Sequence, residues 1–110
     1  MPKRPDNLQG ALDLLILKTL SSRGPLHGYG IALHVESISD DVLRVEEGSL
    51  YPALHRMEQA GWVRSTWRTS ENNRRAKFYG ITAAGSKQLV DEERTWRLVV
   101  GAVQRVLQYS

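Results

Sequence analysis

Apolar residues recur at helical spacing near the start of the chain. One stripe runs up to Gly24-Pro25, a pair that stops a helix, and it consists of Leu8, Leu12, Leu15, Ile16 and Leu20. Asp6 or Asn7 is the candidate N-cap of this helix, because a short polar side chain there accepts from an orphan backbone amide. The pattern predicts a first helix with one core-facing side.

A second, shorter helix follows in "LHGYGIALHVESIS". Its apolar positions are Tyr29, Ile31, Ala32, Val35 and Ile38. Gly28 and Gly30 each lower helix propensity by roughly 1 kcal/mol relative to alanine, so packing must hold this helix. His27 is expected in the turn that opens it. The next segment, "DDVLRV", is predicted to be a linker with a possible short strand.

The stretch "GSLYPALHRMEQAG" predicts a third helix despite its proline. The side chains of Leu50, Ala53, Leu54 and Met57 are expected to face the core, and Gly61 is placed as the C-terminal cap. With Ser49 as the N-cap, Pro52 falls in the first turn. The amide that proline lacks has no partner inside the helix at that point, so the proline is expected to cost no hydrogen bond.

After Gly61 the period changes from helical to alternating. "WVRSTWRT" and "AKFYGIT" predict two strands of a β-hairpin around the polar turn "SENNRR", in which Glu71, Asn72 and Asn73 form the turn. Trp62 is expected in the core or over the junction between helix and hairpin. Trp67 is expected to pack against a second copy of the chain or against the first helix.

The last helix, capped by Thr82, has more apolar surface than packing on one small domain requires. A dimer interface is predicted there, made of Leu89, Trp96, Val99, Val100, Val103, Val106 and Leu107. Trp96 is either an anchor in that interface or one half of a flat aromatic site for a planar effector, and the first interpretation is favoured.

The charge is concentrated in one short segment. The 110-residue chain has a formal net charge of only +3, yet residues 62–80 carry five basic residues against one acid, whereas residues 24–61 carry six acids against two bases. A focused basic patch is typical of a protein that binds a polyanion, although a solvated basic hairpin would also produce it.

Several classes of protein are disfavoured by composition. The chain has no cysteine, which excludes disulfides, catalytic thiolates and cysteine zinc sites. It has no run of about 18 apolar residues for a membrane span, and its first ten residues lack the apolar stretch of a signal peptide. A cytoplasmic protein is therefore expected.

The order of three helices, a basic hairpin and a further helix predicts a mainly α (α+β) fold. It is the layout of a winged helix-turn-helix domain, in which the third helix enters the DNA major groove and the hairpin, or wing, lies along the backbone. Residues 1–82 are predicted to form this domain, with the first helix contributing to the dimer interface. Residues 83–110 are predicted to form a dimerisation helix.

Three segments carry a family resemblance. "HGYGI" at 27–31, "GSLYPALHRMEQAGWV" at 48–63 and "RRAKFYGITAAG" at 74–85 resemble the hallmark segments of PadR-type bacterial transcriptional regulators. The resemblance implies a homodimer that binds a partly palindromic double-stranded DNA operator, usually as a repressor. The single last helix is similar to that of the small PadR subclass. Many members are released from DNA by a small, often aromatic, molecule.

The outward side chains of the third helix are the candidate DNA contacts. They are Ser49, Tyr51, Pro52, His55, Arg56 and Gln59. Ser49 and the first-turn amides suit a phosphate, and Arg56 and Gln59 suit base edges. Alternatively Tyr51 packs under the wing, His55 is simply solvent-exposed, and Arg56 forms a salt bridge with an acid such as Glu36.

The candidate wing contacts are cationic. Arg74, Arg75 and Lys77 are placed to neutralise phosphates, and Arg68 joins them from the first strand. The alternative is a solubilising loop tip.

An enzyme is disfavoured because His27, His34 and His55 accompany no nucleophile motif, phosphate loop or metal-ligand spacing. No cofactor and no metal are expected. The competing function is a winged-helix module for protein–protein contact without sequence-specific DNA binding.

Overall fold

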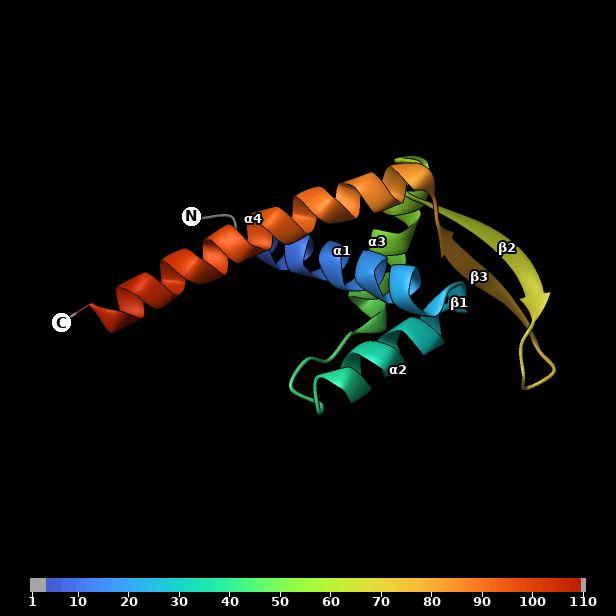
Figure 1. Ribbon diagram of the computed structural model, residues 1–110. Coiled ribbons are helices and arrows are strands. Elements are labelled where there is room, and N and C mark those ends of the chain that lie inside the picture. Colours follow the sequence, from blue (N-terminus) through green and yellow to red (C-terminus); the bar gives the residue numbers. More distant parts are fainter. Residues whose placement is uncertain (1–3, 110) are drawn as a thin grey trace.

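The chain forms four helices and one small antiparallel sheet (Figure 1). The computed structural model describes residues 4–109, with side chains from residue 11 onward. The elements are α1 (Arg4–Arg23), β1 (Leu26–His27), α2 (Gly28–Ile38), α3 (Glu47–Gln59), β2 (Val63–Thr69), β3 (Arg75–Ile81) and α4 (Ala83–Gln108). The sheet order is β1-β3-β2. The predicted hairpin is thus extended by β1, whereas the predicted linker at residues 40–45 forms no strand.

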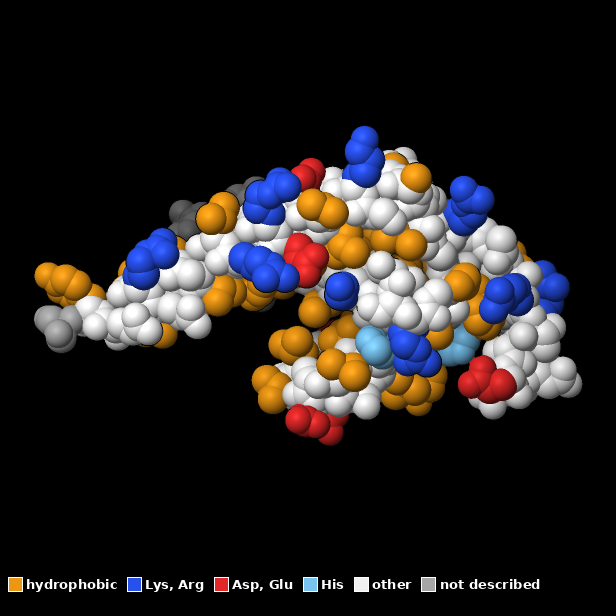
Figure 2. All heavy atoms as spheres, viewed as in Figure 1, with side chains coloured by type: hydrophobic (Ala, Val, Ile, Leu, Met, Phe, Trp, Pro, Cys, Tyr) orange, Lys and Arg blue, Asp and Glu red, His pale blue; other side chains and the backbone are white. Residues whose placement is uncertain are grey.

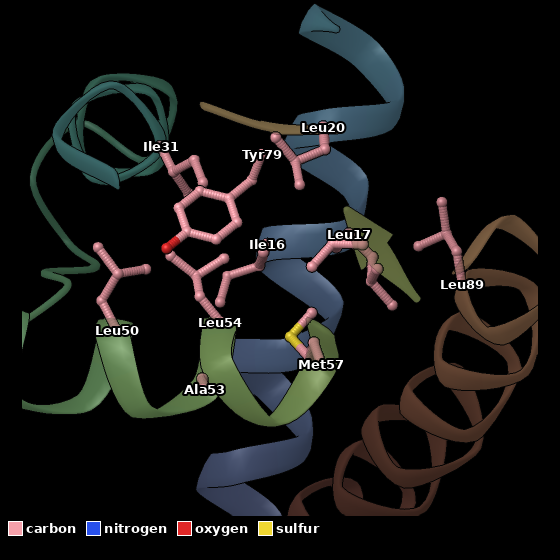
Figure 3. Close-up of a cluster of buried hydrophobic side chains, with 11 residues drawn as sticks. Ile16, Leu17, Leu20, Ile31, Leu50, Ala53, Leu54, Met57, Tyr79 and Leu89 are labelled. Carbon is pink, nitrogen blue, oxygen red and sulfur yellow. The ribbon is translucent and has the colours of Figure 1, made fainter. Parts of the chain in front are cut away.

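The core is built around α1. Ile16, Leu17 and Leu20 are fully buried, and α3 contributes Leu50, Ala53, Leu54 and Met57 (Figure 3). The α3 positions confirm the prediction from spacing. On α1 the prediction was partly wrong, because Leu15 is only half-buried while Leu17 is buried. Since α2, α3, α4 and β3 all contact α1, its buried arc is wider than one stripe. The side chain of Leu8 lies outside the described residues.

Caps and stops set the helix ends. The predicted caps Asp6 and Asn7 were wrong, because the backbone of α1 is already helical from Arg4. Gly24 ends α1 as predicted, with a left-handed φ of +82° that suits glycine. His27 opens α2 as predicted, and its Nδ1 accepts a hydrogen bond from the Gly30 amide at 3.0 Å.

An ion pair joins α1 to α3. The guanidinium of Arg56 donates to both carboxylate oxygens of the buried Asp13, at 2.8 and 3.0 Å. These hydrogen bonds are the main cause that raises the pKa of Arg56 above its ordinary value. The acid anticipated for this salt bridge, Glu36, instead accepts from the amide of Val45 at 3.2 Å. The bidentate geometry fixes the rotation of α3 against α1.

The prediction for the start of α3 was wrong. The helix begins at Glu47 with Glu46 as N-cap, so Pro52 lies in the second turn rather than the first. Proline has no amide to donate, and the carbonyl of Gly48 therefore loses its i+4 partner. Gly48 is exposed, with open space around its Cα, so water can hydrate that carbonyl. The structure thus tolerates the proline through exposure and not through first-turn placement.

The first turns of α4 are locked to the α3–β2 turn. Thr82 caps the helix as predicted: its Oγ1 accepts from the Gly85 amide at 3.0 Å and donates to the Gly61 carbonyl at 2.6 Å. Gly85 is buried against the carbonyl of Trp62, where no Cβ would fit. Trp62 is partly buried against the core, as predicted for the junction. Leu89, one turn further on, is 7% exposed and completes the core from this side.

Beyond Leu89, α4 runs along α1 and then projects past the rest of the fold, at the end of the molecule opposite the wing (Figure 1). Among the described residues, no helix combines the length and the apolar character that a membrane span requires. Because the first turns of α4 belong to the core, the division at residue 82 stays a prediction. The outer ends of the two predicted domains, residues 1–3 and residue 110, lie outside the described part of the chain.

Two glycines of α4 provide a matched stability test. We expect Gly85→Ala to lower the free energy of unfolding by about 2–4 kcal/mol, because the new Cβ overlaps the Trp62 carbonyl and the helix must shift. Gly101→Ala meets only the Arg105 guanidinium at 3.6 Å, and we expect it to stabilise by about 0.5–1 kcal/mol through helix propensity. Urea unfolding of the two variants checks this, and equal effects of the same sign would contradict it.

Candidate nucleic-acid interface

The outward face of α3 is narrower than the sequence predicted. Pro52, His55 and Gln59 are exposed and follow one another at helical spacing, on the side opposite the four buried residues. Arg56 lies at the edge of this face, because its guanidinium is turned to Asp13. His55 and Gln59 are therefore the side chains of α3 best placed to reach base edges.

The N-terminal turn of α3 is a poor phosphate site. The amide of Ser49, a predicted phosphate contact, already donates to the Glu46 carbonyl at 3.0 Å. The carboxylates of Glu46 and Glu47 stand at this end and complement the positive end of the helix dipole. A phosphate there would meet two like charges, which argues against the predicted role of Ser49.

Tyr51 bridges the two helices of the helix-turn-helix. Its ring lies against Gly28 at the start of α2, so closely that a side chain at residue 28 would overlap it. Burial, and then the charge of Glu47, raise the pKa of the Tyr51 hydroxyl. The phenol is therefore neutral and able to donate over the physiological range. With 43% of its surface exposed, Tyr51 is both a packing residue and a candidate DNA contact.

The wing is a regular hairpin whose turn matches the prediction. β2 and β3 pair from Val63 opposite Ile81 to Thr69 opposite Arg75. The Ser70 amide donates to the Arg74 carbonyl, the Asn73 amide donates to the Ser70 carbonyl, and Asn73 has a left-handed φ of 60°. This is the arrangement of a three-residue hairpin loop in which the last residue is left-handed.

The four predicted wing cations have different surroundings. The Arg68 guanidinium lies 4.2 Å from the centre of the Phe78 ring, and that of Arg75 lies 5.8 Å from the centre of the Trp67 ring. Lys77 forms an ion pair with Glu58 of α3 at 3.6 Å. Arg74 is exposed beside the turn.

Trp67 is 59% exposed on the wing, which corrects the expectation that it packs on the first helix. Its strand lies on the far side of β3 from β1, at the outer edge of the sheet.

A cleft separates the wing from the two helices. It has a volume of about 330 Å³ and is lined by His27, Gly28, Tyr29, Tyr51, Ser70, Asn72, Arg74, Arg75, Ala76 and Lys77. Figure 2 shows basic side chains at this end of the molecule and others along α4. Three cations from the wing thus face two phenols from the helices across one opening.

The contribution of α2 to this cleft was not predicted from the sequence. Tyr29 was assigned to the core stripe of α2, yet it is 63% exposed and its ring stacks on that of His27, with 6.4 Å between the ring centres. The signal was present in the spacing, because Tyr29 lies two positions before Ile31 and therefore off the face that Ile31 and Val35 share.

The predicted dimer residues divide into two groups. Leu89 is buried within its own chain, so its assignment to the interface was wrong. Val100 is half-buried, and the others are exposed on the outer part of α4: Trp96, Val99, Val103, Val106 and Leu107. Figure 2 shows apolar side chains gathered on this projecting arm. Among the described residues, no cluster of three or more His, Asp or Glu side chains is arranged to hold a metal ion.

Known proteins share this architecture over most of their length. A transcriptional regulator from Clostridium thermocellum superposes with a TM-score of 0.80 at 28% identity, covering 91% of this chain and 96% of that one. A PadR-like transcriptional regulator from Bacillus cereus superposes with a TM-score of 0.77 at 30% identity, covering 96% and 99%.

One curated relative is much longer than this chain. It is an uncharacterized 37.1 kDa protein in transposon Tn4556 of Streptomyces fradiae, 36% identical over 90 residues, which are 82% of this chain and 24% of that protein. The chain spans about a quarter of the length of that relative. The model of the PadR-like transcriptional regulator family matches residues 16–91, which include α2, α3, the wing and the start of α4. The chain belongs to the PadR-like family of transcriptional regulators.

Proposed function

We propose that the protein is a homodimeric repressor that binds a palindromic DNA operator and is released by a small aromatic ligand. Regulators of this family bind DNA and are not enzymes. The observation that carries the proposal is the cleft between α3 and the wing, where three wing cations face the exposed side of the helix-turn-helix.

The geometry suits one docking mode. With α3 in the major groove, His55 and Gln59 point at base edges, and one DNA strand passes along the cleft. Arg74 and Arg75 then neutralise its phosphates, while the hydroxyl groups of Tyr29 and Tyr51 donate to phosphate or sugar oxygens. Base contacts from α3 supply specificity, and wing contacts supply affinity.

The exposed apolar surface on the outer part of α4 supports the dimer. The predicted interface residues of this arm, led by Trp96 and Val103, are covered when two copies pair about a two-fold axis. Two recognition helices then meet half-sites about 34–36 Å apart, or a multiple of that distance. The indole of Trp96, 42% exposed on this surface, is the proposed contact for a planar aromatic ligand.

The wing is tested with Arg74→Ala combined with Arg75→Ala. We expect weaker binding to all duplexes and a plot of log Kd against log salt whose slope is reduced by about two, because two phosphate contacts are lost. Fluorescence anisotropy on labelled duplexes across a salt series measures this. An unchanged slope would remove the wing from the interface, and no binding by the parent protein at low salt would favour the protein–protein module instead.

The recognition helix is tested with Gln59→Ala. We expect the preference for operator over random DNA to fall by about 1–3 kcal/mol, while binding to random DNA stays the same. The wing double variant is the matched contrast, because it should weaken both duplexes equally. If Gln59→Ala weakens both equally, Gln59 contacts backbone and not bases.

The dimer is tested with Trp96→Ala and its counterpart Leu98→Ala. The two residues lie roughly 160° apart around α4 and are both exposed large apolar residues. We expect Trp96→Ala to raise the dimer dissociation constant at least tenfold, as expected for an aromatic anchor, and Leu98→Ala to change it far less. Sedimentation velocity over a concentration series distinguishes the variants. A Trp96→Ala dimer as tight as the parent would contradict the role of Trp96.

A further inference from the structure

Glu58 connects the recognition helix to both strands of the wing. Its Oε2 accepts a hydrogen bond from the Ser65 hydroxyl of β2 at 2.6 Å, and its Oε1 lies 3.6 Å from the Lys77 Nζ of β3. The side chains of Glu58 and Lys77 keep 33% and 38% of their surface exposed. One carboxylate on α3 therefore meets two strands at positions that face the same side of the hairpin.

The same contacts change the role expected of Lys77. Its ammonium is paired to Glu58 and lies 5.8 Å from the centre of the Tyr79 ring. Burial, and then the charge of Glu58, raise the pKa of the Tyr79 hydroxyl. A lysine held between an acid and a phenol is less available to a phosphate than Arg74 or Arg75.

We infer that Glu58 is a positioning residue for DNA binding, which holds the wing at a fixed angle to α3 so that α3 and the wing meet the DNA together. In this inference Lys77 pairs with Glu58 to hold the wing and does not contact the phosphates. The inference rests on the proposed DNA-binding function. The chain joins α3 to β2 through only three residues, 60–62, and β1 pairs with β3 at Phe78 and Tyr79. The Glu58 contacts to Ser65 and Lys77 add a direct side-chain connection between α3 and both strands of the hairpin.

A positioning role for Glu58 and simple electrostatics predict opposite effects on DNA affinity when the charge of Glu58 is removed. Glu58 is an acid beside a surface that meets a polyanion, so removal of its charge alone should strengthen DNA binding. A positioning role requires the reverse, because the loosened wing loses orientation entropy when it binds. The sign of the effect therefore separates the two interpretations.

The experiment measures the Kd of full-length variants on one operator duplex over a salt series. We expect Glu58→Gln to weaken binding roughly three- to tenfold, the worth of one hydrogen-bonded contact, with the salt slope unchanged. Glu58→Asp keeps the charge but is one methylene too short, and we expect a similar loss. The matched control is Glu71→Gln, which removes an equal charge from a wing residue that makes no hydrogen bond or ion pair with the described residues. This control should bind equally well or slightly tighter.

A charge exchange completes the test. We expect Glu58→Lys and Lys77→Glu to weaken binding singly, and the double variant to recover part of the loss, because the pair is restored with the net charge unchanged. Thermal unfolding of each variant separates a general loss of stability from a loss of binding. Tighter binding by Glu58→Gln, or no recovery in the exchange, would overturn the inference while leaving the regulator proposal intact. No DNA binding by the parent protein would instead sink the proposed function.

Discussion

The burial of one face of α1 is the constraint on which the other elements depend. Ile16, Leu17 and Leu20 are fully buried, and they can be so only if α2, α3, α4 and β3 all pack around the same helix. A chain of this size has a single core, so each of these elements is oriented by its contact with α1. The positions of α3 and of the outer part of α4 are therefore both set by α1, through Asp13 and Arg56 on one side and Leu89 on the other.

The sides of α3 carry four different tasks. One side supplies the core residues, and the neighbouring side holds the wing through Glu58 and packs Tyr51 on α2. Across the helix, Arg56 holds α1. Only the strip with Pro52, His55 and Gln59 remains for a DNA groove. A helix of thirteen residues can carry all four because the side chains for each task lie on a different side of it.

Periodicity was sufficient to predict the four helices, the hairpin and the core of α3, because a repeat of apolar residues reflects burial directly. The same holds for the Gly24 and Gly61 ends and for the Thr82 cap, where local chemistry decides. The predictions failed where a distant partner decides. Arg56 looked outward-facing in sequence, and only the fold places Asp13, 43 positions earlier, within reach.

The start of α3 was missed for a related reason. The sequence predicted Ser49 as the N-cap, yet the N-cap is Glu46, three residues earlier, and the helix begins at Glu47. Once the start moves, Pro52 enters the second turn and requires an exposed carbonyl at Gly48. β1 was missed because two residues are too few to show a period, and they pair only because β3 is already in place beside them.

The wing shows two ways of holding a cation, and they differ in what they leave for DNA. Arg68 and Arg75 each lie over an aromatic ring, and such a contact uses the flat face of the guanidinium while the N–H donors on its edge stay available. At exposed positions it costs little to rearrange, since it is worth about 0.5–1 kcal/mol. Lys77, in contrast, directs its donors at Glu58. Stacking on a ring therefore orients an arginine whose donors can still bind a phosphate. The ion pair instead uses a lysine to position the wing. The basic patch of the wing thus contains cations with two different roles.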